Sequence, residues 1–216
     1  MTSRFLLEFF TLFAIINPLG LAFVFLNRTM SLSDPERRIA ARQVAIYAFF
    51  VLIVSMFAGG AILGFFGVSM PALRIAGGLV VAASGWALLH ESNEEEGRAA
   101  TSTHGLEAVR QMTFFPLTVP LTTGPGTIAV AITLGSRHDV FNLDLKSELV
   151  SVVVAAAISS CIFYAYAHVS RMARLFGAEG TRVIMRLSAF LLLCIGVQIV
   201  ITGVVEVVES FLAAKI

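Results

Sequence analysis

The sequence predicts an all-α polytopic membrane protein with six transmembrane helices. Of its 216 residues, 57% are hydrophobic and only 13% are charged, and the mean hydropathy is +0.88. Soluble domains carry about 25% charged residues, so this composition excludes an ordinary soluble enzyme. Two cysteines are too few for a disulfide-stapled domain, and a net charge of +1 does not fit a nucleic-acid-binding protein.

Six apolar segments are long enough to cross a membrane, since a helix needs about 20 residues to span roughly 30 Å of hydrocarbon. They lie at 5–26, 44–66, 70–89, 112–134, 149–168 and 187–208. The first segment contains Asn17 and lacks both a clear basic n-region and a small-residue cleavage site, so we expect a retained helix. The segments predict a three-helix repeat over 1–90, a polar cytoplasmic loop at 91–111 and a second three-helix repeat over 112–216.

The distribution of basic residues predicts the orientation in the membrane. Ten of the 15 Lys and Arg residues lie in or beside the first, third and fifth loops: Arg28, Arg37, Arg38, Arg42, Arg98, Arg110, Arg171, Arg174, Arg182 and Arg186. The five on the other side are Arg4, Arg74, Arg137, Lys146 and Lys215. The ten-residue side is therefore expected in the cytoplasm, with both termini in the periplasm.

The two halves of the chain repeat the same landmarks. Proline 18 corresponds to proline 125, Phe66-Gly67 to Phe176-Gly177, and Arg74 to Arg186, at nearly one offset. Each half has three spans, an odd number, so the two halves are expected to be inverted relative to each other in the membrane.

Prolines predict that the first and fourth helices are broken. Pro18 lies inside the first span, and Pro116, Pro120 and Pro125 lie inside the fourth. An interior proline removes a helix hydrogen bond and clashes with the preceding turn. In lipid, the freed backbone groups must face protein or a water-filled cavity, so we expect gaps around residues 15–17 and 122–124.

Each break has the chemistry to restart a helix in the middle of the membrane. Asn17 is a good N-cap before Pro18, and Thr123 or Gly124 precedes Pro125 in the same way. A helix start presents unpaired amides equivalent to about half a positive charge. Two such starts predict a site for a small anionic group such as a carboxylate. The alternative is that the prolines are kinks that only shape packing.

Four motifs make the sequence resemble the MarC family of six-span bacterial inner-membrane proteins, which includes the SnatA-type small neutral amino-acid transporters. The motifs are NPLG at 17–20, SMPALRIAGG at 69–78, PLTVPLTTGPGTI at 116–128 and GVQI at 196–199. The resemblance covers nearly the whole chain. It implies a multi-pass inner-membrane protein of two inverted repeats that transports glycine- or alanine-like zwitterions. One departure is Thr122-Thr123, where relatives have small residues such as Ala, and this affects the size and polarity of the pocket.

We therefore predict that a substrate carboxylate binds between the two breaks. The substrate is expected to cross the membrane by alternating access. The candidate substrate-binding residues are Asn17, Pro18, Leu19, Gly20, Thr122, Thr123, Gly124, Pro125, Gly126 and Thr127. We expect no catalytic residue, no metal ligand and no cofactor. The expected partners are a small neutral amino acid, the lipid bilayer and a coupling cation, either sodium or a proton.

Other functions remain open at this point. One is export of other small solutes or drugs, although no Asp or Glu lies at the centre of a span to pair a cation. Another is a non-transport membrane protein. A third is an intramembrane hydrolase built on Ser84 and His168, although no acid is placed to orient the histidine. Glu8 and Glu206 are expected at the membrane interfaces, and Arg74 and Arg186 are expected to anchor or gate the two faces.

Overall fold

The computed structural model describes residues 2–90, 113–135 and 145–213. Throughout this part the chain is helical and contains no strand, which confirms the all-α prediction. The predicted cytoplasmic loop at 91–111 lies outside the described residues.

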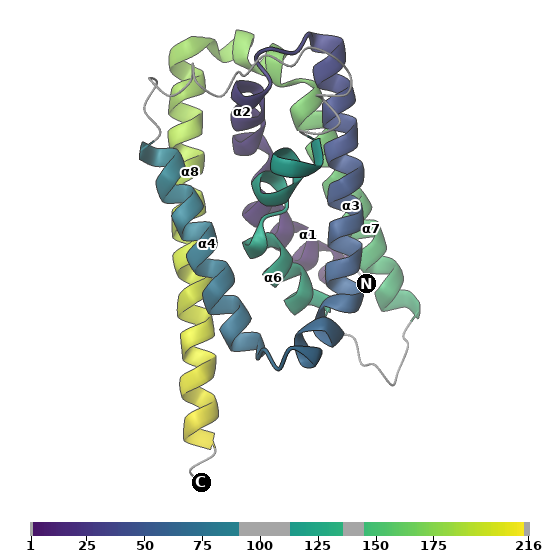
Figure 1. Cartoon of the computed structure of the whole chain (residues 1–216), viewed down its shortest axis with the longest axis vertical. Helices are drawn as coiled ribbons and strands as arrows, with labels where there is room; N and C mark the ends of the chain where they lie inside the picture. The colour runs from purple at the N-terminus through teal and green to yellow at the C-terminus, as the bar shows by residue number, and fades with distance from the viewer. Residues whose placement is uncertain (1, 91–112, 136–144, 214–216) are drawn as a thin grey trace.

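Seven α-helices and one π-helix make up the described fold (Figure 1). They are α1 (Thr2–Ile16), α2 (Pro18–Arg28), α3 (Asp34–Phe65), α4 (Met70–His90), the π-helix η1 (Thr113–Thr122), α6 (Pro125–Gly135), α7 (Leu145–Ala167) and α8 (Val169–Ala213). Helix α8 turns a corner at Gly177, whose backbone is non-helical with φ of 66°.

Five segments of the described chain are long and apolar enough to cross a membrane. They are Thr2–Arg28, Asp34–Phe65, Met70–His90, Glu148–Ala167 and Glu179–Ala213. These segments overlap five of the six predicted spans. The predicted fourth span at 112–134 is instead η1 followed by α6, a shorter apolar helix at Pro125–Gly135. Two interior prolines and the break at 123–124 explain why no continuous α-helix forms there.

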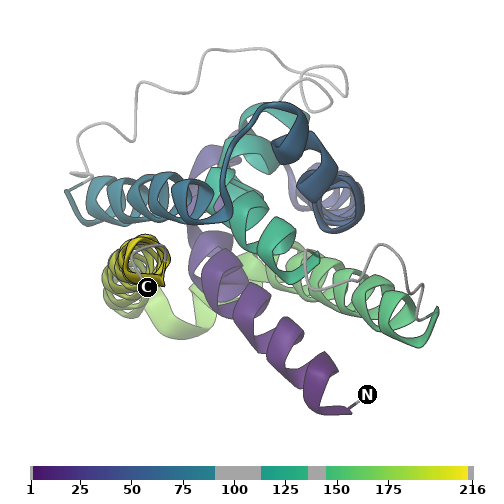
Figure 2. The ribbon, with the colours of Figure 1, turned by 90° about the horizontal axis from the view of Figure 1, so that it is seen from below.

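The helices pack in a reciprocal pattern (Figures 1 and 2). Helix α3 packs on α7, and α4 packs along α8. The broken first segment, α1 and α2, contacts α7 and α8, while η1 and α6 contact α3 and α4. Exchanging the first half of the chain for the second therefore leaves this contact pattern unchanged.

Equivalent elements of the two halves also run in opposite directions. In Figure 1, α2 and α4 run upward whereas α6 and α8 run downward, and α3 runs downward whereas α7 runs upward. Gly67 and Gly177, which occupy equivalent positions in the sequence repeat, both have positive φ, at 67° and 66°. Glycine is required there because other residues rarely adopt this conformation.

Small residues allow α4 and α8 to pack closely. A Cβ added to Gly85 would lie 2.5 Å from the Leu193 nitrogen and 2.8 Å from the Ala189 oxygen, and one on Gly196 would overlap the backbone of Ala82. The outer faces of these helices expose large apolar side chains such as Leu79, Phe190 and Leu191. An apolar outer face is what a bilayer requires of a spanning helix.

Candidate functional site

The first break is a single residue, Asn17, between α1 and α2. Asn17 has left-handed backbone angles, φ 45° and ψ 59°, and its Oδ1 accepts a hydrogen bond from the Gly20 amide at 3.2 Å. The predicted N-cap is thus confirmed. The predicted gap at residues 15–17 is too wide, because Ile15 and Ile16 remain helical and the Asn17 amide still donates to the Phe13 carbonyl at 2.8 Å.

The first break rests on α8 at Ser188. The Asn17 Nδ2 donates to the Ser188 carbonyl at 3.4 Å. A Cβ on Gly20 would overlap the Ser188 side chain, so only glycine permits this approach. Pro18 is also buried, whereas the Leu19 side chain is 49% exposed. Of the candidate residues at this break, Leu19 therefore lies away from the contact with α8.

The second break follows a π-helix rather than an α-helix. The wider helix places hydroxyls against carbonyls five residues back: Thr118 donates to Thr113 at 2.6 Å and Thr122 donates to Leu117 at 2.7 Å. Thr123 donates to the Thr118 carbonyl through both its amide, at 2.8 Å, and its hydroxyl, at 3.1 Å. Prolines at 116 and 120 supply no amide hydrogen to an α-helical ladder, which disfavours a regular α-helix in this segment.

The helix restart after the second break is capped by Gly124 and not by Thr123. The Gly124 carbonyl accepts the first bond of α6, from the Ile128 amide at 3.0 Å. The Thr123 hydroxyl points back to η1. Within the described residues no side chain caps the amides of Gly126 and Thr127. Within the first turn of α6, Gly126 and Thr127 are buried, with Thr127 only 4% exposed, whereas Pro125 is exposed.

Thr122 connects the second break to α7 through a residue that the sequence analysis missed. Its Oγ1 lies 2.9 Å from the Tyr166 hydroxyl. Tyr166 is fully buried and stacks on Phe25 of α2, with ring centroids 4.5 Å apart. The available signal was a tyrosine near the end of an apolar run, since a buried phenol needs a hydrogen-bond partner.

The second break rests on α4, as the first rests on α8. A Cβ on Gly126 would overlap the Val81 side chain and would lie 3.0 Å from the Gly77 carbonyl. A Cβ on Gly77 would in turn lie 2.6 Å from the Ala129 Cβ. Gly77 and Ser188 follow shortly after Arg74 and Arg186, the two arginines paired in the sequence repeat. Each break therefore packs on the third spanning helix of the other half.

Two acidic residues of the spans, Glu8 and Glu206, form ion pairs. Glu8 is 2% exposed, and its carboxylate accepts from Arg4 at 2.7 Å and from Ser151 of α7 at 3.0 Å. Glu8 was expected at a membrane interface, and its burial between α1 and α7 was not predicted. Glu206 forms an ion pair with Arg74, whose Nε also lies 3.5 Å from the Thr133 Oγ1 of α6.

The groups considered for catalysis are not brought together. The Ser84 hydroxyl donates to the Val80 carbonyl at 2.8 Å, and the His168 Nδ1 lies 3.0 Å from the Tyr164 carbonyl. In the described ranges, no cluster of three or more His, Cys, Asp or Glu side chains could hold a metal ion.

Comparison with known proteins gives consistent matches over almost the entire chain. Residues 2–208 match the family described as MarC family integral membrane protein. The UPF0056 inner membrane protein MarC of Salmonella typhimurium is 33% identical over 208 residues, with 93% of both chains covered. The protein of the same name from Citrobacter koseri is 34% identical over 211 residues, again with 93% of both chains covered. No solved structure matches this chain significantly.

Proposed function

This chain belongs to the MarC family of integral membrane proteins, and on that premise we propose that it is a secondary transporter of small neutral amino acids. Its relatives are inner-membrane proteins and its described helices are apolar and long, so it is a multi-pass protein of the inner membrane. The proposed substrates are glycine- or alanine-like zwitterions that bind at the two helix breaks.

The observation that carries this proposal is the reciprocal packing of the breaks. The first break lies against Ser188 of α8, and the second lies against Gly77 of α4. This arrangement, the opposite helix directions and the matched Gly67 and Gly177 support two inverted three-helix repeats. Transporters built from such repeats bind substrate at discontinuous helices near the bilayer midplane, where the two repeats meet.

The carboxylate of the substrate is proposed to bind at the first turn of α6. A carboxylate in a low-dielectric site needs fixed donors, because an unpaired charge there is very costly. The uncapped amides of Gly126 and Thr127 and the Thr127 hydroxyl are such donors, whereas the Gly20 amide is already bonded to Asn17. The second break is therefore the better anion site of the two.

The ammonium group is proposed to bind at carbonyls where η1 ends. The Leu117 and Thr118 carbonyls already accept from threonine hydroxyls. The carbonyls of Thr122 and Thr123 follow at the end of η1, beside the restart of α6. At the first break, the Asn17 side chain accepts from the Gly20 amide and donates to the Ser188 carbonyl. A movement of α8 would therefore change the hydrogen bonding of Asn17.

Alternating access would require the contacts between each break and the opposite half to change in turn. The Asn17–Ser188 contact and the Arg74–Glu206 ion pair each join elements from both halves. These are the contacts we expect to separate as the binding site opens to one face. A sodium or proton gradient would supply the driving force.

Uptake of radiolabelled glycine and alanine into proteoliposomes tests the proposal, with sodium and proton gradients imposed separately. We expect Thr127→Val to raise the half-saturating concentration about tenfold, the effect of losing one hydrogen bond to a charged group. Thr202→Val is the matched control, since Thr202 is exposed on α8 and donates only to the Gln198 carbonyl. Uptake no faster than in protein-free vesicles under either gradient would refute the proposed function.

A further inference from the structure

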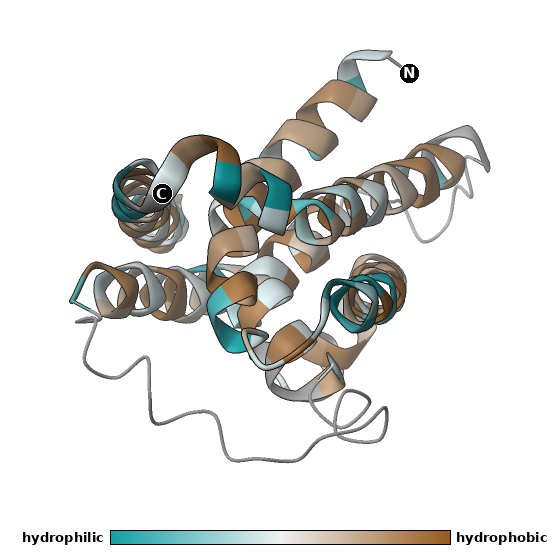
Figure 3. Ribbon diagram, turned by 90° about the horizontal axis from the view of Figure 1, so that it is seen from above, coloured by the Kyte–Doolittle hydropathy of each residue, from teal (hydrophilic) through white to brown (hydrophobic). Residues whose placement is uncertain are grey.

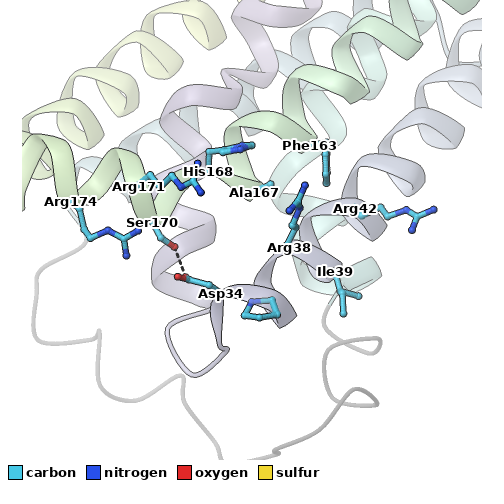
Figure 4. A pocket seen from close by; sticks show the side chains of 11 residues that line it. Asp34, Arg38, Ile39, Arg42, Phe163, Ala167, His168, Ser170, Arg171 and Arg174 are labelled. Atoms are coloured by element: carbon cyan, nitrogen blue, oxygen red, sulfur yellow. Dashed lines mark hydrogen bonds between the residues drawn. The ribbon is translucent and has the colours of Figure 1, made fainter.

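A pocket of about 740 Å³ lies where α3 begins and α7 passes into α8 (Figure 4). Arg38 and Arg42 line it from α3, and Arg171 and Arg174 line it from α8. Four arginines thus line one cavity from two helices that are far apart in the sequence. The proposed transport site uses none of these residues.

The charge of the pocket is not neutralised by the described protein. The four arginine side chains are exposed, and in the described ranges none of them forms an ion pair or a side-chain hydrogen bond. The acidic lining residue is Asp34, whose Oδ1 already accepts from Arg37 at 2.8 Å and from Ser170 at 2.9 Å. Neighbouring positive charges with no counter-charge favour the binding of an anion.

A buried arginine holds the two walls of the pocket together. Arg37 is 8% exposed and donates to the carbonyls of Thr29 and Leu32, both at 2.8 Å. Its Nη1 reaches Ser170 of α8 at 2.9 Å. These bonds join the end of α2, the start of α3 and the start of α8. The helix ends that carry the lining arginines are therefore held together before any ligand binds.

The pocket lining is apolar as well as basic. Ile39, Phe163 and Ala167 form its apolar part, and the Ile39 side chain is 43% exposed. The same end of the bundle carries hydrophilic residues in α3 and α8 when seen from above (Figure 3). The volume lies within the roughly 300–1,000 Å³ of sites for drug-sized ligands, which is far more than a single phosphate ion needs.

We propose that this pocket binds the phosphate headgroup of an anionic phospholipid from the leaflet at this end of the bundle. The arginines would pair with phosphate oxygens, for which the guanidinium fork is well suited. The apolar residues would contact the glycerol and the first acyl carbons. Basic pockets between membrane helices are a known form of lipid recognition, and a free phosphate ester shares the same chemistry.

The test uses the full-length protein in detergent, with lipid binding followed by native mass spectrometry. Phosphatidylglycerol is expected to remain bound, while phosphatidylcholine, which carries a phosphate but no net charge, is not. Inorganic phosphate and glycerol 3-phosphate form the soluble arm, and we expect them to compete poorly. If either soluble anion binds as tightly as phosphatidylglycerol, the lipid assignment is overturned.

The double variant Arg38→Gln/Arg171→Gln locates the binding site. We expect roughly thirtyfold weaker binding of phosphatidylglycerol, since each basic residue near an anionic lipid contributes about one factor of five. The control is Arg182→Gln, at an exposed arginine of α8 outside the pocket whose ion pair with Glu179 is at the surface. Unchanged binding in the double variant, or an equal loss in the control, would show that the pocket is not the site. An unaltered unfolding midpoint without lipid would show that the variants are folded.

Discussion

Asn17 shows how one residue combines backbone geometry with side-chain bonding. Among the described residues, Asn17 is the only one other than glycine with a positive φ, at 45°. Asparagine tolerates this region better than residues without a short polar side chain. The same side chain caps α2 and bonds to the Ser188 carbonyl of α8. A substitution at this position therefore changes both the backbone and the contact between the halves.

Replacing Asn17 by Ala and by Gly separates these two contributions. Both variants lose the bonds to Gly20 and Ser188, and loss of the cap costs about 1 kcal/mol with alanine but only about a few tenths with glycine. Alanine, unlike glycine, is also strained by about 1 kcal/mol in the left-handed backbone conformation of this position. We therefore expect Asn17→Ala to be the less stable variant in sodium dodecyl sulfate titration of mixed micelles. Equal stabilities of the two variants would contradict a left-handed residue at this position.

Two adjacent glycines of α3 illustrate the element scale, because they face different surroundings. A Cβ on Gly59 would overlap the Ile132 side chain of α6, whereas a Cβ on Gly60 would meet nothing within 4 Å. Small residues in spanning helices commonly let a neighbouring helix pack closely. The structure shows that only Gly59 does so, since Gly60 lies on the outer face of the helix.

Alanine substitutions distinguish these glycines. We expect Gly59→Ala to destabilise the protein by about 1–3 kcal/mol, because the added methyl group forces α3 and α6 apart. Gly60→Ala is the matched control and is expected to be neutral or stabilising by up to about 1 kcal/mol, from the higher helix propensity of alanine. The free energy of unfolding in mixed micelles measures both. A greater loss at Gly60 than at Gly59 would place the wrong face of α3 against α6.

The packing of Gly126 limits the use of bulky substitutions at the second break. A valine there would overlap Val81 of α4, so a loss of binding would also follow from altered packing. Removal of the Thr127 hydroxyl avoids this overlap, because valine has nearly the same shape as threonine. The element that forms the proposed site therefore also joins the two halves.

At the scale of the whole molecule, one ion pair joins three elements. Arg74 of α4 pairs with Glu206 of α8 and lies beside Thr133 of α6, and its side chain is 19% exposed. The sequence analysis treated Arg74 and Glu206 as separate interfacial residues. The structure brings them together because α4 and α8 run antiparallel along most of the length of α4.

A double-mutant cycle measures this pair. We expect Glu206→Gln alone to cost roughly 1–2 kcal/mol, because it leaves a mostly buried guanidinium without its carboxylate. The double variant Arg74→Gln/Glu206→Gln is expected to recover part of that loss, with a coupling energy of about 1 kcal/mol. Strictly additive single effects would mean that the two charges do not interact.

The orientation of the whole bundle is tested by single cysteines at its two ends. Ser31 lies between α2 and α3, and Ser69 lies between α3 and α4; both are exposed and they lie at opposite ends (Figure 1). In a variant without Cys161 and Cys194, an impermeant thiol reagent applied to intact cells is expected to label Ser69→Cys and not Ser31→Cys. The reverse pattern would invert the predicted topology and leave the fold unchanged.

Much of the local structure could be predicted from the sequence. Hydropathy predicts the spans, because the bilayer requires long apolar helices, and capping chemistry predicts a helix restart at Asn17-Pro18. These features depend on residues that are neighbours in the chain. The prolines in Thr113–Thr122 predicted a broken helix but not a π-helix. The wider turn depends on hydrogen bonds from threonine hydroxyls to carbonyls five residues back, which the sequence pattern does not reveal.

By itself, the sequence determined that this protein is an all-helical membrane protein interrupted at Asn17 and near Gly124. Hydropathy and proline chemistry are local properties of the chain, so they can be interpreted without knowledge of the fold. Only the tertiary structure decided that each break packs on the opposite half, that Tyr166 bonds to Thr122, and that four arginines form one pocket. Those contacts join residues far apart in the chain, and their partners are selected by how whole helices pack, a property that no short sequence pattern records.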